Sequence, residues 1–149
     1  MPEAPGLWPY ALAVYARPGV AEVCLEAQDA HGADVPLLLW GAWAAARGRT
    51  LTQDDMAAAR GLAHHWREPI IAPLRQVRRA LKALPADALR QAVKAAELEA
   101  ERLYLAALED LARDWPDAPA APQGLRDNLA RLLPPDAAPV TERLHKALS

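Results

Sequence analysis

The residues best suited to chemistry are the cations of one segment, LRQVRRALK at positions 74 to 82. If this segment is helical, its four cations fall within about 100° of one another around the helix axis. We call them the basic stripe: Arg75, Arg78, Arg79 and Lys82. Guanidinium groups hold phosphates and carboxylates through paired hydrogen bonds. The stripe therefore predicts an anion-binding face for RNA, DNA, a nucleotide or an acidic protein surface, with Trp66 as the aromatic residue close to it in sequence.

The fold itself offers these cations another role. A long helix is predicted to follow the stripe in the antiparallel direction, and it carries Glu97, Glu99 and Glu101. Ion pairs with these carboxylates, or plain solvation, would leave no surface for a ligand. Nucleic-acid-binding modules usually combine a broader basic field with stacking aromatic residues, whereas this chain has a net charge of −2. Both interpretations of the stripe stay open from the sequence.

A second group of charges is acidic. Glu22, Glu26 and Asp29 follow one another at spacings of four and three residues, so they share one face of a predicted helix. A divalent cation needs several oxygen ligands that converge on one point, and side chains on a solvated helix face diverge. We therefore expect this acidic face to be solvated or to contact a partner, and not to bind a metal.

Other candidate residues give little indication of a site. His64 and His65 point about 100° apart on a helix, and His64 with Glu68 lacks the second pair that a helical metal centre uses. Cys24 lies on the apolar side of its predicted helix, so we expect a small buried hydrophobe. No GxSxG, P-loop or GxGxxG motif is present. The sequence thus predicts no catalytic residue, no cofactor and no metal, although it does not decide whether the protein is an enzyme.

The elements that must position these residues are helices. Ala, Leu, Arg and Glu dominate the 149 residues and Phe is absent, a composition that favours helix over sheet. Residues 35–46 are apolar on nearly every side, so this helix must be buried. We expect an all-α bundle around it. The helices predicted to wrap it lie at residues 20–27, 56–66 and 89–111, the last with an apolar line that includes Leu89 and Leu103.

Caps and prolines set the predicted boundaries. Asp34 suits the N-cap of the central helix, while Thr52 and Asp55 resemble a capping box at the start of the next. Pro69 and Pro73 each remove a helical hydrogen bond, so the path must break or kink between residues 67 and 72.

Proline-rich stretches divide the chain into two parts. They lie at residues 115–124 and 134–139. We predict a helical bundle domain over residues 1–114. The remaining tail, residues 115–149, is predicted to hold two short amphipathic helices that pack on the body or stay mobile.

Several features predict a cytoplasmic protein that does not associate with membranes. The single cysteine fits a reducing compartment. Glu3 stands where a secretory signal would carry basic residues. The longest apolar stretch, residues 35–46, is shorter than the roughly 20 residues needed to cross a bilayer.

Three blocks of the sequence resemble a known family. They read LWPYALAVYARPGVAEVCLEAQDAHGADVPLLLW, WREPIIAPLRQVRRALK and ELEAERLY, and together they cover about residues 7–110. The chain is similar to a small proteobacterial family of hypothetical proteins, described as a domain of unknown function. The resemblance implies an all-helical cytoplasmic protein and carries over no activity, cofactor or catalytic residue. Pro69 departs from the uninterrupted helix that the resemblance implies.

The function predicted from these residues is recognition of another molecule. We expect a non-enzymatic adaptor or regulatory protein that binds a protein partner through the basic stripe, with the acidic face as a second contact. The alternative is a nucleic-acid or phosphate-ligand binder that uses the same stripe. A small helical enzyme or metalloprotein centred on His64 and Glu68 is the third interpretation, and the oligomeric state stays open.

Overall fold

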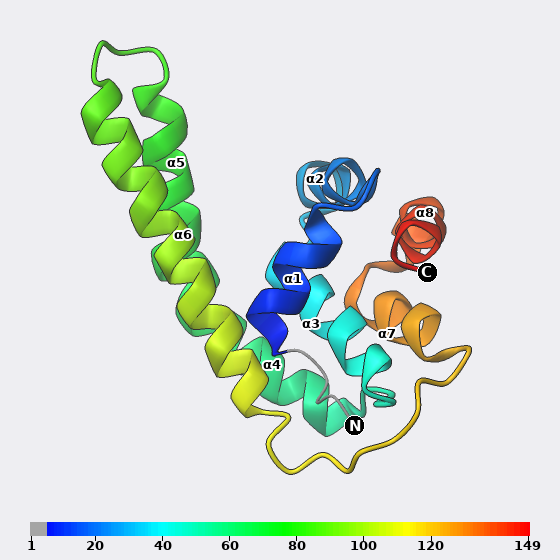
Figure 1. The fold of residues 1–149 in the computed structure, drawn as a ribbon. Coiled ribbons are helices and arrows are strands. Elements are labelled where there is room, and N and C mark those ends of the chain that lie inside the picture. The colour runs from blue at the N-terminus through cyan, green and yellow to red at the C-terminus, as the bar shows by residue number, and fades with distance from the viewer. Residues whose placement is uncertain (1–5) are drawn as a thin grey trace.

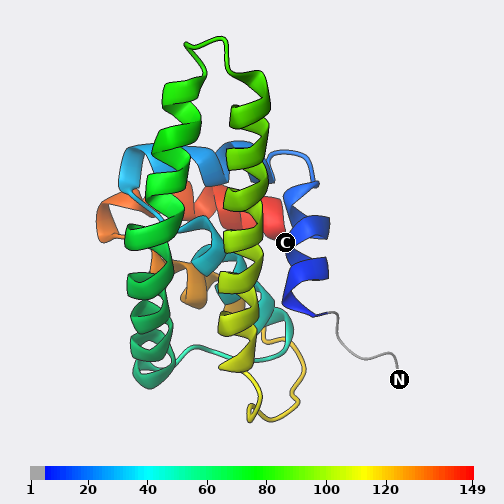
Figure 2. The same ribbon diagram turned by 90° about the vertical axis from the view of Figure 1, so that its left-hand side faces the viewer.

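The computed structural model describes residues 6–149, which fold into a helical bundle with no strand among them (Figures 1 and 2). The predicted all-α fold is confirmed. Residues 1–5 lie outside the described part, and so does the expectation drawn from Glu3. Within residues 6–149, none of the helices combines the length and the apolar character that crossing a membrane requires.

The helices follow one another through short turns, apart from one long linker over residues 111–123. Residues 6–110 contain α1 (Leu7–Tyr15), α2 (Val20–His31), α3 (Val35–Ala46), α4 (Gln53–Trp66), α5 (Ala72–Leu81) and α6 (Asp87–Asp110). The tail contains α7 (Gly124–Leu132) and α8 (Ala138–Leu148). A π-helical turn, η1 (Arg67–Ile71), joins α4 to α5, and a 3-10 turn, η2 (Pro135–Ala137), leads into α8.

Helix α3 lies inside the body, where every residue from Leu37 to Ala45 is buried. The carboxylate of Asp34 caps its N-terminus by accepting a hydrogen bond from the backbone N–H of Leu37 at 3.3 Å, as predicted. Trp40 and Trp43 of α3 are the largest fully buried side chains among the described residues. Both contact Trp115 at ring-centroid distances of 5.8 and 6.3 Å, so α3 also holds the start of the linker.

Helix α7 covers a face of α3 for which the sequence predicted no neighbour. Gly41 permits the close approach, because a Cβ added there would collide with Leu132 of α7. Asn128 of α7 is fully buried, accepts a hydrogen bond from Leu51 N–H at 2.9 Å, and donates to the backbone oxygens of Gly41 and Arg49 at 3.0 Å. The tail residues in the hydrophobic core are Leu129, Leu133, Ala137, Val140, Leu144 and Leu148. The structure thus places both tail helices on the body.

Helices α5 and α6 form an antiparallel pair, which we call the arm, whose end stands clear of the body in Figures 1 and 2. Pro69 does not end the helix that leads into the arm. The hydrogen-bond ladder instead widens into the π-helical turn, where the N–H of Ala72 bonds to the carbonyl of Arg67 five residues back. A change of hydrogen-bond register therefore stands where the sequence predicted a break or kink.

The buried face of α6 differs from the predicted apolar line. Leu89 and Leu103 are exposed, whereas Glu97, Tyr104 and Leu108 are buried. Two polar contacts accompany this orientation. Glu97 pairs with arginines of α5, and the hydroxyl of Tyr104 donates to the Asp34 carboxylate at 2.7 Å. Ala100 and Leu105 are buried as well, so the inward side of α6 combines an apolar face with these two polar contacts.

Candidate partner-binding groove

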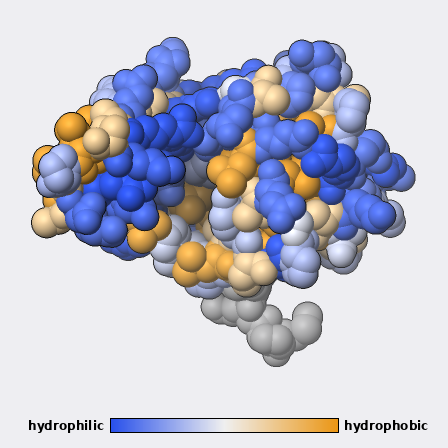
Figure 3. Space-filling model, turned by 90° about the horizontal axis from the view of Figure 1, so that it is seen from above, coloured by the Kyte–Doolittle hydropathy of each residue, from blue (hydrophilic) through white to orange (hydrophobic). Residues whose placement is uncertain are grey.

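A groove separates the arm from the body. It lies between α5 and α6 on one side and α1, α2 and the N-terminal half of α3 on the other, with a volume of about 330 Å³. Figure 3 shows the hollow from above, with hydrophobic and hydrophilic residues meeting along it. This volume falls at the lower end of the range for ligand clefts, roughly 300–1,000 Å³.

The body side of the groove is apolar. Its lining residues include Trp8, Ala11, Val35 and Leu39. Three further leucines of the lining are half exposed. Leu12 of α1 at 54% and Leu25 of α2 at 48% lie on the body side, and Leu98 of α6 at 54% lies on the arm side. Scattered exposed leucines are ordinary on a protein surface, but leucines gathered around one groove are typical of an interaction site.

The arm side carries a cluster of ion pairs. Arg78 donates to Glu97 from Nε at 2.6 Å and from Nη2 at 3.4 Å. Arg75 lies 3.5 Å from a carboxylate oxygen of Glu97 and 3.8 Å from one of Glu101. The Glu97 side chain is only 9% exposed. Arg75 and Arg78, half of the basic stripe, are therefore paired within the fold.

The third predicted partner of the stripe, Glu99, lies elsewhere. It forms an exposed pair with Arg102 one turn along α6, at 2.5 and 3.0 Å. Residues four apart share a side of a helix and residues two apart do not, so Glu97 and Glu101 face α5 while Glu99 faces solvent. Spacing on the helix thus separates the carboxylates that join the groove from the one that does not.

The surroundings of the cluster shift the pKa values of Glu101 and Arg78 from their ordinary values. Burial, and then the charge of Glu97, raise the pKa of Glu101 above its ordinary value. The hydrogen bond to Glu97 raises the pKa of Arg78. Glu101 therefore loses its charge at a higher pH than an exposed glutamate, whereas the guanidinium charges persist.

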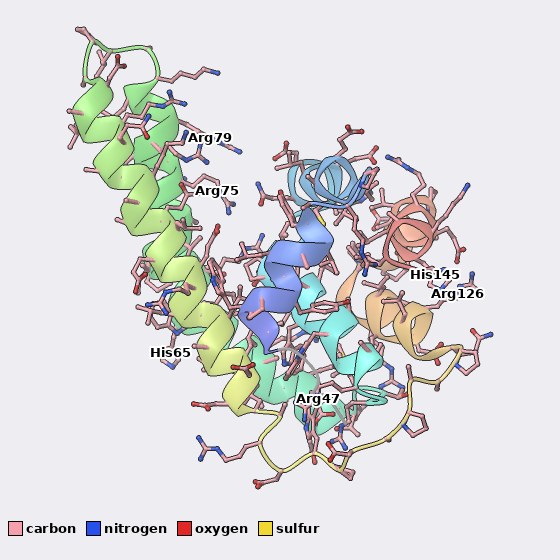
Figure 4. The ribbon with its side chains drawn as sticks, in the orientation of Figure 1. Arg47, His65, Arg75, Arg79, Arg126 and His145 are labelled. Atoms are coloured by element: carbon pink, nitrogen blue, oxygen red, sulfur yellow. The ribbon has the colours of Figure 1, made fainter. Side chains whose placement is uncertain are left out.

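The outer half of the stripe is more open. Arg79 is 59% exposed at the side chain, and its Nη2 lies 3.8 Å from the carboxylate of Asp29 on α2, which is also exposed. Figure 4 shows Arg75 and Arg79 reaching from α5 toward the body. Among residues 6–149, no ion pair includes Lys82. An exposed pair at 3.8 Å contributes little, so Arg79 is available at the mouth of the groove.

A comparison with protein families identifies the family of this chain. A family model described as "Protein of unknown function (DUF2390)" matches residues 6–108. The chain belongs to this family. No curated protein and no solved structure matches the chain. The groove lining runs from Trp8 to Leu105, so the whole groove falls within the DUF2390 region, whereas α7 and α8 lie beyond it.

The remaining predicted contact residues of the DUF2390 region lie outside the groove. Trp66, at the end of α4, is half-buried and packs against the core. On α2, Glu22 is exposed, Glu26 forms an ion pair with Arg143 of α8, and Asp29 is the residue that meets the stripe. The acidic face is therefore partly engaged within the fold, with Glu22 at its open end.

The histidines and the cysteine of the DUF2390 region form no cluster. Nδ1 of His64 lies 3.7 Å from Glu68 on the open surface. In the part of the chain that the structure describes, no group of three or more His, Cys, Asp or Glu side chains could hold a metal ion. Cys24 is free and buried, and burial raises the pKa of its thiol to about 11. The predicted role of Cys24 as a small buried hydrophobe is confirmed, because a thiol of this kind is rarely ionised near neutral pH.

Asp34 fixes the arm to the body beside the groove. Its carboxylate caps α3 and also accepts the hydrogen bond from Tyr104 of α6. Arg67 adds a bond from its guanidinium to the carbonyl of Gly32 at 2.7 Å. Burial raises the pKa of Asp34, against the hydrogen bond from Tyr104 and the charge of Arg67. The sequence predicted the cap but not the link between α3 and α6.

Sequence reasoning missed the leucines at the rim of the groove. Leu25 lies next to Glu26 on α2, and Leu98 lies between Glu97 and Glu99 on α6. A large apolar residue among acidic neighbours, off the buried stripe of its helix, is the signal that could have identified them. The apolar periodicity alone directs attention to the core.

Proposed function

We propose that this protein is a cytoplasmic, non-enzymatic adaptor or regulatory protein that binds an amphipathic segment of a partner protein in the groove. The observation that supports this function is a groove lined by the half-exposed leucines Leu12 and Leu25 of the body, Leu98 of the arm and the ion-pair cluster around Glu97. An amphipathic helix laid in the groove would cover the leucines with its apolar side. A carboxylate at its edge would meet Arg79.

The energetics favour the apolar contacts as the main source of affinity. Covering the exposed half of one leucine contributes on the order of 1 kcal/mol, so one such contact changes the dissociation constant several-fold. The open guanidinium of Arg79 adds charge complementarity, which affects specificity and association rate more than affinity. Leu98 and Arg79 are therefore the most informative positions to change.

The pairing within the stripe favours a protein partner over nucleic acid. Binding to nucleic acid depends on several phosphate contacts, but Arg75 and Arg78 already engage Glu97 and Glu101. A segment with leucine-like side chains and a single carboxylate fits the remaining open groups better. Nucleic acid is one of the outcomes that the experiment below separates.

The test is affinity capture from a native lysate treated with nuclease, using the full chain and two pairs of matched variants. Leu98→Asp changes the groove, and Leu103→Asp places the same change on another side of α6. Arg79→Glu reverses a charge at the groove mouth, and Arg102→Glu does so on the exposed side of α6. All four residues are exposed, so each variant should keep the thermal stability of the parent.

The expected result is a protein that the parent and both controls retain and both groove variants lose. Retention of the same proteins by all variants would contradict the proposal. Material that disappears on nuclease treatment, together with retention on heparin that weakens steeply with salt, would instead establish the nucleic-acid alternative.

A further inference from the structure

The end of the arm carries a second apolar surface, separate from the groove. Around the turn between α5 and α6, a run of small and apolar residues is exposed, and two leucines are the most open large hydrophobics: Leu84 at 56% and Leu89 at 55%. We call it the tip surface: Ala83, Leu84, Pro85, Ala88 and Leu89, with the cations Lys82, Arg90 and Lys94. Figure 1 shows this end of the arm away from every other element.

The charge of the tip surface is positive. Between positions 82 and 94 the sequence has three cations, Lys82, Arg90 and Lys94, and one carboxylate, that of Asp87. Among the ion pairs of residues 6–149, none includes these three cations. Lys82 and Lys94 are exposed, whereas Arg90 is half-buried and its Nε is enclosed. The surface therefore fits a partner that offers both an apolar side chain and carboxylates.

The same molecule displays a surface of that kind on α2. Glu22, Leu25, Glu26 and Asp29 are all exposed, and they put three carboxylates beside one large apolar side chain. An ion pair between the arm and α2 already exists within one molecule, where Arg79 of the arm lies 3.8 Å from Asp29 of α2. Glu22 lies at the end of the acidic face and has no ion-pair partner among residues 6–149.

From this complementarity we infer that two copies of the chain associate, with the tip surface of each copy against the acidic face of α2 of the other. The two contacts are then equivalent and related by a two-fold axis, the commonest symmetry of protein dimers. Lys82 and its basic neighbours face Glu22 and its acidic neighbours, and Leu84 and Leu89 cover apolar surface at Leu25. Because each contact is small, the dimer is weak and depends on concentration. This inference does not rest on the proposed function.

The test is sedimentation equilibrium of the full chain at low ionic strength, from about 1 μM to about 500 μM, a range suited to a small interface. The expected result is a monomer–dimer equilibrium that shifts toward monomer as salt is added. Lys82→Glu and Glu22→Lys each reverse a charge in both contacts and should weaken dimerisation at least about tenfold. The double variant, Lys82→Glu with Glu22→Lys, should regain most of the lost affinity.

Two controls separate this interface from other causes. Arg131→Glu makes a charge reversal on α7 and should leave the equilibrium unchanged. Leu89→Asp should weaken the dimer, whereas Leu103→Asp should not. A chain that stays monomeric at the highest concentration overturns the inference. A dimer that ignores both single reversals, or a double variant that regains nothing, overturns it as well.

Discussion

The contact between α3 and α7 and the contact between α5 and α6 join helices by opposite means. Helices α3 and α7 meet at a glycine, with one buried amide, Asn128, satisfying three backbone groups. Helices α5 and α6 meet around Glu97 and two arginines, and exposed leucines continue to the end of the arm. The first contact excludes water and specifies one packing, whereas the second leaves charge and apolar surface available to other molecules.

This difference separates stability from recognition within one small fold. A fully satisfied buried polar group rigidifies its surroundings, because any other arrangement leaves it unpaired. A partly open ion cluster contributes less to stability, since solvent competes with each pair. We therefore expect substitutions at the α3–α7 contact to change the free energy of unfolding most, and substitutions in the arm to change binding first.

The largest effect is expected for Asn128→Ala. The change leaves the N–H of Leu51 without its acceptor and removes the donor from the carbonyls of Gly41 and Arg49. Each unsatisfied buried group costs about 1–3 kcal/mol, so the free energy of unfolding should fall by roughly 3 kcal/mol or more in urea denaturation. Gln91→Ala removes an exposed amide from the arm and is the control. A loss below about 1 kcal/mol for Asn128→Ala would remove the contrast between the two contacts.

A smaller loss is expected for Glu97→Gln in the arm. The amide keeps the shape of the side chain but leaves Arg75 and Arg78 with Glu101 as their remaining carboxylate. Because both arginines are partly open to water, we expect a loss of about 1–3 kcal/mol, below that of a fully buried pair. Glu99→Gln changes an exposed pair and should have no measurable effect. Equal results for the two glutamates would show that the cluster at Glu97 is solvated.

How far the sequence predicts this structure depends on the range of the interaction. The all-α fold, the cap at Asp34 and the capping box of Thr52 and Asp55 follow from neighbours within four residues, and all are observed. The contact between α3 and α7 was not predicted, because Asn128 finds its partners 77, 79 and 87 residues away. A lone asparagine in a short amphipathic helix carries no local signal of burial.

The groove also depends on contacts between residues that are far apart in the sequence. The stripe of cations on α5 and the carboxylates that pair with it could both be read from helical spacing. Which cations are paired depends on the rotation of α6, and the contacts of α6 with the body include the hydrogen bond from Tyr104 to Asp34, 70 residues apart. The leucines at the rim come from three helices, so only the assembled fold brings them together.

Two glycine substitutions test how tightly α3 packs against α7. In Gly41→Ala the new methyl group meets Cδ1 of Leu132 of α7, and this partly exposed side chain must shift, so we expect a loss at the low end of the roughly 1–3 kcal/mol that overpacking costs. In Gly61→Ala, on α4, the methyl group enters open space, so the higher helix propensity of alanine should stabilise by about 0.5–1 kcal/mol. Thermal denaturation of both variants measures the sign. A stabilising Gly41→Ala would mean that Leu132 moves aside at no cost.

The smallest effects concern pH, and they have opposite signs at Asp34, the N-cap of α3, and Asp55, in the first turn of α4. Burial raises the pKa of Asp34 above its ordinary value of 3.8. Asp55 is also partly buried, but hydrogen bonds from Arg49 and Thr52 outweigh the burial and lower its pKa below 3.8. By linkage, stability from Asp34 is present below pH 3.8 and is lost as pH rises through the raised pKa. Stability from Asp55 is present above pH 3.8 and is lost as pH falls through the lowered pKa.

Asn substitutions at the two positions test these signs, since Asn does not titrate and is itself a good cap. Relative to the parent, Asp34→Asn should gain stability as pH rises from about 3 to about 7, because the parent bears the cost of a buried charge at the higher pH. Asp55→Asn should lose stability over the same interval, because only the parent acquires the charged pair with Arg49. Urea denaturation at both pH values gives the two differences. If the stability of both variants changed in the same direction, net charge and not the individual carboxylates would control the pH dependence. Asp34, which links α3 to α6 through Tyr104, would then be as well solvated as a surface carboxylate.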